Sequence, residues 1–186
     1  MYKKTVKDLM IPVHQYPAIN QNESMYEAML AVKKANANRL ESHEPFRAVL
    51  VLNDEGRVVG KIGMLAFLKA LEPNYKGILD LDKLTRISLS SVHIETMISQ
   101  FNLWKSDSAD FKRLAERVKA KEVMSDVHER IEQDESIVSA IHKIIMWQSV
   151  SILVSDGNEI VGILRLKDLY LAIEDFILNN NNNHNN

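Results

Sequence analysis

The spacing of apolar residues along this chain changes from helical to strand-like and back, and the same order of changes occurs twice. In the first half, Ser24 and Glu27 form a capping-box pattern at the start of a helix. The apolar face of that helix consists of Met25, Ala28, Met29 and Val32. Two apolar runs follow, Ala48 to Leu52 and one ending near Ile62, and the turn residues 53–56 between them predict a β-hairpin. A closing helix is predicted from Met64, Phe67, Leu68 and Leu71.

The second half has the same order of elements. After Ser136, a helical face is formed by Ile137, Ala140, Ile141, Ile144 and Ile145. The run from Val150 to Val154, the turn residues 155–158 and a run ending near Leu164 predict a second hairpin. The closing helix carries Leu166, Leu169, Tyr170, Ile173, Phe176 and Ile177.

Three short segments also match between the halves, in the same order. The matching pairs are Val6–Met10 with Ala120–Met124, Glu23–Met29 with Glu135–Ile141, and Asp54–Gly60 with Asp156–Gly162. The separation within a pair falls by about ten residues at the last match, which extra polar residues in a loop of the first half explain at little entropic cost. The chain is therefore predicted to contain an internal repeat.

The repeat predicts an α/β (α+β) fold made of two units, each with the order strand, helix, strand, strand, helix. One unit of about 60 residues is marginally stable alone, so the two are expected to share a core as a pseudo-twofold pair. The predicted boundaries are 1–71 and 119–178 for the two repeats and 72–118 for a helical insertion. The Asn-rich tail, 179–186, is predicted to be disordered.

These units resemble the CBS (cystathionine-beta-synthase) domain, in the tandem arrangement called a Bateman-type module. The resemblance rests on the element order, on Val-Lys-Asp-Leu-Met at 6–10, and on Val-Val-Gly or Ile-Val-Gly in the last strand of each repeat. It implies a regulatory module that binds AMP, ADP, ATP or a related adenosine ligand, often as a homodimer. Some members of the family bind no known ligand and act in dimerisation, so this alternative stays open.

The family's ligand signature is Gly, two mostly apolar residues, Thr or Ser, two residues and Asp, after the last strand. The second repeat keeps the Asp as Asp168, implied to bind the ribose, and has Arg165 at the hydroxyl position, where it could hold a phosphate. The first repeat has Gly63 and Ala66 at these positions. The resemblance therefore places a nucleotide site in the second repeat, formed by Ser149, Val150, Ile152, Arg165 and Asp168. An acidic residue in the first turn of a helix also has a purely structural role, because its negative charge stabilises the positive end of the helix dipole.

The insertion contains two predicted helices. One starts at Ser91 and has an apolar face of Val92, Ile94, Met97, Ile98, Phe101 and Trp104. The other spans 110–121, with Phe111, Leu114, Ala115 and Val118 facing inward. The insertion is expected to pack on its own module; a dimer interface or the docking site of an unidentified effector protein are the alternatives.

Composition narrows the function. The chain has 186 residues and no cysteine. Its formal net charge of −2 gives no reason to expect binding to nucleic acid or to an anionic membrane. No signal-peptide pattern and no apolar run of about 20 residues is present, so a cytoplasmic protein without a membrane span is expected. The six histidines are scattered, and no metal, nucleophile-elbow or phosphate-loop motif occurs. We therefore expect no enzyme, no metal and no cofactor beyond an adenosine nucleotide ligand.

Overall fold

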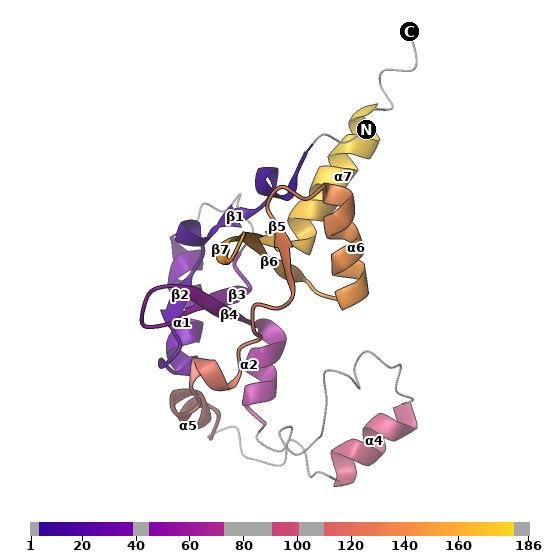
Figure 1. Cartoon of the computed structure of the whole chain (residues 1–186). Helices are drawn as coiled ribbons and strands as arrows, with labels where there is room; N and C mark the ends of the chain where they lie inside the picture. Colours follow the sequence, from indigo (N-terminus) through magenta and orange to yellow (C-terminus); the bar gives the residue numbers. More distant parts are fainter. Residues whose placement is uncertain (1–3, 39–44, 73–90, 101–109, 181–186) are drawn as a thin grey trace. The chain divides into compact units, whose positions relative to one another are not determined.

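The computed structural model describes residues 4–38, 45–72, 91–100 and 110–180 (Figure 1). Contacts divide the chain into two compact units. The central unit consists of Pro17–Ser125, and the terminal unit combines Met1–Tyr16 with Asp126–Asn186. Phe101, Trp104 and residues 181–186 of the predicted disordered tail lie outside the described residues. The first two residues of that tail, Asn179 and Asn180, belong to a helix and not to a disordered segment.

The central unit contains a three-stranded sheet of order β2-β3-β4. Strand β2 runs parallel to β3, and β3 forms an antiparallel hairpin with β4. Its elements are β2 (Ala18–Asn20), α1 (Met25–Ala37), β3 (Ala48–Leu52), β4 (Val58–Gly63), α2 (Met64–Ala70), α4 (Ser91–Gln100), α5 (Asp110–Arg117) and a 3-10 turn (Ala120–Glu122).

The terminal unit contains a four-stranded sheet of order β1-β7-β6-β5. Strand β5 is parallel to β6, and β7 is antiparallel to both β6 and β1. Its elements are two 3-10 turns (Val6–Asp8 and Val13–Gln15), β1 (Ile11–Pro12), β5 (Arg130–Glu132), α6 (Ile137–Trp147), β6 (Ser151–Asp156), β7 (Glu159–Arg165) and α7 (Leu166–Asn180). The predicted mixed class and the order strand, helix, strand, strand, helix are confirmed in both repeats.

The two hairpins also share an irregularity. The pairing of β3 with β4 shifts register between Val51 and Leu52, and the pairing of β6 with β7 shifts between Val154 and Ser155. A β-bulge of this kind inserts an extra residue and bends the strand, and such bulges are kept as features of a fold. The internal repeat therefore extends to the details of strand pairing.

The opening segments of the two repeats are exchanged between the compact units. Val6 is fully buried in the core of the terminal unit, and its N–H donates to the carbonyl of Glu135 at 3.0 Å. Ala120, the matching residue of the second repeat, is fully buried in the core of the central unit and donates to the carbonyl of Glu23 at 2.9 Å. The predicted boundaries at 1–71 and 119–178 follow the sequence repeats, whereas each compact unit contains the opening segment of the other repeat.

Helix α5 belongs to the core of the central unit. Ala115 is 5% exposed in that core, and α5 contacts α1. Phe111, Leu114 and Val118, the other residues predicted to face inward, are half-buried. On α4, by contrast, Val92, Ile94 and Ile98 are exposed.

Side-chain caps fix where α1 and α6 begin. The Ser24 hydroxyl accepts from the N–H of Glu27, and the Glu27 carboxylate in return accepts from the N–H of Ser24 at 2.6 Å. Hydrogen bonds from the hydroxyl and the backbone N–H of Ser24 hold the pKa of the Glu27 carboxyl below its ordinary value. Ser136 caps α6 by accepting from the N–H of Ser139 at 3.1 Å. Each cap satisfies an N–H group that has no partner within its helix.

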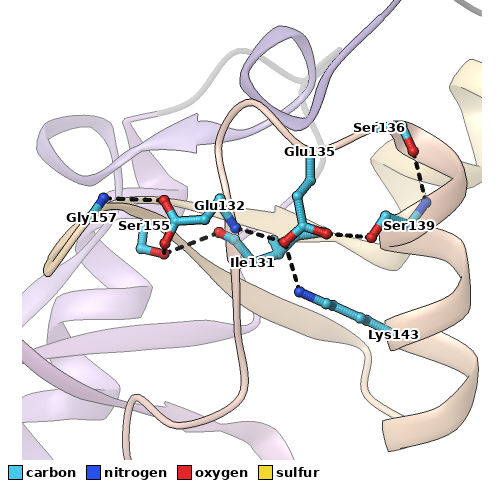
Figure 2. A network of polar contacts seen from close by, with 8 residues as sticks. All are labelled: Ile131, Glu132, Glu135, Ser136, Ser139, Lys143, Ser155 and Gly157. Carbon is cyan, nitrogen blue, oxygen red and sulfur yellow. Dashed lines mark hydrogen bonds and ion pairs between the residues drawn. The ribbon is translucent and has the colours of Figure 1, made fainter.

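A polar network joins β5, β6 and the start of α6 (Figure 2). The Glu132 carboxylate accepts from the Ser155 hydroxyl at 2.8 Å and from the N–H of Gly157 at 3.1 Å. The Glu135 carboxylate accepts from the Lys143 ammonium at 2.8 Å and from the Ser139 hydroxyl. Partial burial raises the pKa of Glu135, but these two bonds and the N–H of Glu132 favour the charged form and leave the pKa below its usual range.

Candidate functional site

The predicted site residues lie where β6 begins and where β7 passes into α7. Ser151 of β6 is paired with Arg165, the last residue of β7. The N–H of Leu166, the first residue of α7, donates to the carbonyl of Val150 at 2.9 Å. These backbone pairings bring the predicted segment 149–152 beside Arg165 and the first turn of α7.

Arg165 and Asp168 form a bidentate ion pair at this place. The Nε of Arg165 donates to Oδ2 of Asp168 at 2.5 Å, and a terminal guanidinium nitrogen donates to Oδ1 at 2.6 Å. The side chains are only 16% and 20% exposed. Bidentate charge-assisted bonds of this kind are strong and fix the orientation of both groups. The carboxylate predicted to hold a ribose is therefore held by the arginine predicted to hold a phosphate.

The three other predicted residues differ in what they can offer to a ligand. The Ser149 hydroxyl donates to the carbonyl of Ser151 at 2.7 Å. Val150 is 74% exposed and so has an accessible apolar side chain. Ile152 is fully buried in the core of the terminal unit, so its side chain is occupied by packing and cannot contact a ligand.

The corresponding place in the first repeat lacks both charged groups. Gly63 precedes α2 and makes no side-chain cap, and Ala66 packs against the core of the central unit. The two helix starts therefore differ: α7 begins beside an ion pair, and α2 begins with apolar residues.

The described residues contain no cluster of side chains suited to bind a metal ion. Among residues 4–38, 45–72, 91–100 and 110–180, no three histidine, aspartate or glutamate side chains are gathered as a metal ion requires. None of the helices in those ranges has the length and apolar character needed to span a membrane.

Comparison with known proteins agrees with this architecture. Residues 6–73 match the model of the CBS domain family. A CBS domain-containing protein of unknown function from Bacillus anthracis has a TM-score of 0.60 and 18% identity, over 93% of this chain and 94% of its own. An uncharacterized conserved protein from Pyrococcus horikoshii has a TM-score of 0.57 and 16% identity, over 92% of each chain. A search of curated proteins found no significant match.

The fold therefore defines a module built from CBS-type repeats. Residues 6–73 match the CBS domain, and the two repeats have the fold of structures built from tandem CBS domains. Another similar structure is that of CBSX2 in complex with AMP, with a TM-score of 0.56 and 13% identity, over 92% of this chain and 97% of that chain.

Proposed function

We propose that this protein is a regulatory module that binds an adenosine-containing ligand, such as AMP, ADP or ATP, without catalysing a reaction on it. The observation that carries the proposal is the Arg165–Asp168 ion pair at the start of α7, beside the first residue of β6, Ser151. The similarity to CBSX2, which was solved with AMP, supports the ligand class.

The ion pair suggests how the ligand competes for the site. A ribose diol can donate two hydrogen bonds to the Asp168 carboxylate, but that carboxylate already accepts two bonds from Arg165. A nucleotide compensates for the lost pair, because its phosphate gives the guanidinium a new bidentate partner. Backbone N–H groups in the first turn of α7 add to the attraction for a phosphate. Adenosine brings no such compensation, so the site should favour nucleotides over the nucleoside.

Regulation requires that the ligand bind one state of the protein better than another. Arg165 belongs to β7 and Asp168 to α7, so rearranging the pair acts directly on the junction of strand and helix. We propose that this junction transmits ligand binding to the surfaces through which the module assembles.

Calorimetry with ATP, AMP and adenosine tests the proposal. Asp168→Ala should weaken nucleotide binding about ten- to a hundredfold, the equivalent of roughly 1.5–3 kcal/mol for bonds to a charged group. Arg165→Ala should weaken ATP more than adenosine, because only the phosphates need the cation. Asp175→Ala, on the same helix, is the control and should bind as the wild type does. Wild-type affinity in Asp168→Ala would move the site elsewhere.

A second candidate function is assembly alone, with no nucleotide ligand. It is favoured by the apolar side chains that α1, α2, α6 and α7 expose, among them Met29, Met64, Leu68, Ile145, Met146, Tyr170 and Ile177. Exposed apolar helix faces are typical of protein interfaces, and symmetric homodimers are the commonest assemblies. We propose that the protein forms a homodimer through these helices, with or without a ligand. Absence of heat with every nucleotide, in a protein that light scattering shows to be dimeric, would favour this candidate.

A further inference from the structure

The central unit has an apolar groove of about 470 Å³ between α1 and α2, lined in part by Met29, Met64 and Leu68. This volume lies within the roughly 300–1,000 Å³ of small-molecule sites, which are mostly apolar and contain a few polar groups that orient the ligand. The charged residues of the lining are Lys33 and Arg47, and both are exposed. Within the part of the chain that the structure describes, neither cation belongs to an ion pair.

Hydrogen bonds hold one wall of the groove in place. Phe46 belongs to the lining and is buried. The Asn36 side chain accepts from the N–H of Phe46 at 2.7 Å and donates to the carbonyl of Phe46 at 3.0 Å. These two bonds tie the backbone of Phe46 to the last turn of α1 and so position Arg47, the next residue. Met29 and Met64 are unbranched and flexible, so they can adapt to the shape of an occupant.

The matching helices of the second repeat close on each other at this place. The repeat pairs Val32 with Ile144 and Phe67 with Leu169. Ile144 and Leu169 are 4% and 2% exposed in the core of the terminal unit, where α6 contacts α7. Val32 and Phe67 are only half-buried and line the groove. The opening between α1 and α2 is therefore not imposed by the fold that the two repeats share.

The two cations are also particular to the first repeat. The residues that match Lys33 and Arg47 in the second repeat are Ile145 and Ser149, which carry no charge. An open apolar groove and two cations thus occur together in one repeat, where the other has buried apolar side chains and uncharged residues. This combination suits a ligand that is apolar along its length and anionic at one end.

We propose that the groove binds a free single-chain amphiphile with an anionic head, such as a fatty acid. The aliphatic chain lies between α1 and α2, because burial there removes its apolar surface and that of the lining from water. The carboxylate lies beside Lys33 and Arg47, where it accepts charge-assisted hydrogen bonds.

This site is independent of the proposed nucleotide site. Every residue that lines the groove belongs to the central unit, whereas Arg165 and Asp168 belong to the terminal unit. The exposed side chains of the groove are among those proposed above for the homodimer, so a second copy is the competing occupant. Apolar side chains of a second copy would cover the methionines, but an amphiphile also brings the anion that the two cations attract.

Calorimetry with decanoate, dodecanoate and 1-decanol tests the proposal on the full-length protein, below the concentrations at which micelles form. Dodecanoate should bind about fifteenfold more tightly than decanoate, because each buried methylene contributes about fourfold in affinity. Decanoate should bind about tenfold more tightly than 1-decanol, because only the carboxylate makes charge-assisted bonds. Excess ATP should not displace dodecanoate.

Two pairs of variants locate the site. Leu68→Glu places a charge in the groove and should abolish dodecanoate binding. Its control is Leu65→Glu on the same helix, because Leu65 is exposed and does not line the groove. Lys33→Ala combined with Arg47→Ala should lower the affinity for decanoate to that for 1-decanol and keep the dependence on chain length. Lys34→Ala, which removes a neighbouring exposed cation outside the groove, should bind as the wild type does.

The proposal is overturned if dodecanoate binds equally well to Leu68→Glu and the wild type, or if ATP displaces it. Absence of dodecanoate binding, in a protein that light scattering shows to be dimeric, would assign the groove to the second copy instead. Binding to anionic phospholipid vesicles without binding of free dodecanoate would assign it to a membrane surface. ATP affinity, measured on the same samples, checks that each variant is folded and tests the nucleotide proposal separately.

Discussion

A Cβ atom added to Gly162 would lie 2.8 Å from the carbonyl oxygen of Ile11 and equally close to the sulfur of Met10. Gly162 is in β7 and pairs with the neighbouring strand β1, which is the exchanged opening segment of the first repeat. Gly60 of the central unit has the same relationship to Met124, whose sulfur lies 2.9 Å from the corresponding position. The glycine in each last strand thus allows the opening segment of the other repeat to approach.

Gly162→Ala should therefore destabilise the terminal unit. A methyl group cannot fit at 2.8 Å from a backbone oxygen, so β1 would have to shift, and overpacking of this kind costs roughly 1–3 kcal/mol. The free energy of unfolding from urea denaturation measures the effect. Gly63→Ser is the control, because a Cβ there meets no atom within 4 Å and serine is a favourable residue before a helix. Equal stability of Gly162→Ala and the wild type would show that β1 does not lie where the structure has it.

Much of each repeat could be predicted from local sequence. The apolar runs, the turns between them and the serines before α1 and α6 specify hairpins and helix starts by short-range physics. The exchange of opening segments could not be predicted in this way. Segments 6–10 and 120–124 resemble each other, so each has apolar contacts suited to either sheet, and local patterns do not decide which sheet it joins.

The candidate site was only partly predictable for a similar reason. The positions of Arg165 and Asp168 at a helix start followed from the repeat, and their i, i+3 spacing is one at which opposite charges meet. Because the family resemblance assigns both residues to a ligand, it does not predict their mutual ion pair. Ile152 lies in the middle of an apolar run, and this position indicated a core side chain as strongly as a site residue.

The network around Glu135 predicts a loss of stability in acid. Its carboxyl has a lower pKa in the folded protein than in an unfolded chain, so the folded state binds its proton less readily. The resulting stability is present above the ordinary glutamate pKa of about 4.3 and is lost as the pH falls through the lower folded value. Urea midpoints measured from pH 7 down to pH 3 should fall more steeply for the wild type than for Glu135→Gln.

Glu159→Gln is the control for that experiment, because Glu159 is an exposed carboxylate at the start of β7. It should retain the steep pH dependence of the wild type. Identical slopes for wild type and Glu135→Gln would contradict a favourable contribution from the charged carboxylate.

The hydrogen bonds that cap α1 predict a change in the pKa of one group, the carboxyl of Glu27. Ser24→Ala removes the hydroxyl that donates to Glu27 at 2.7 Å and caps the helix, and should cost about 1 kcal/mol of stability. It should also raise the pKa of Glu27 toward its ordinary value, because the Ser24 hydroxyl is the largest cause of the lowering. An NMR titration of the Glu27 carboxyl measures this shift, with Glu135 in the same sample as an internal reference. A Glu27 pKa that stays low in Ser24→Ala would assign the effect to the backbone N–H of residue 24 and the charge of Lys119.

The Arg165–Asp168 pair should also be measurable in the absence of any ligand. Its two bonds of 2.5 and 2.6 Å are shielded from solvent, so its coupling energy should exceed the roughly 0.2–1 kcal/mol of an exposed pair. A double-mutant cycle with Arg165→Ala, Asp168→Ala and the combined variant isolates this coupling from the other effects of each substitution.

The matched control is the pair Lys112–Glu116, which is longer at 3.8 Å and is 73% and 49% exposed. Raising the salt concentration to about 0.5 M should remove most of the control coupling, because exposed charges are screened, and leave most of the Arg165–Asp168 coupling. The combined variant should also lose less stability than the two single variants lose in sum. The reason is that each single variant leaves one shielded charge without its partner. Equal coupling in the two cycles would mean that Arg165 and Asp168 are solvated independently, and the competition between the arginine and a ribose for Asp168 would then disappear.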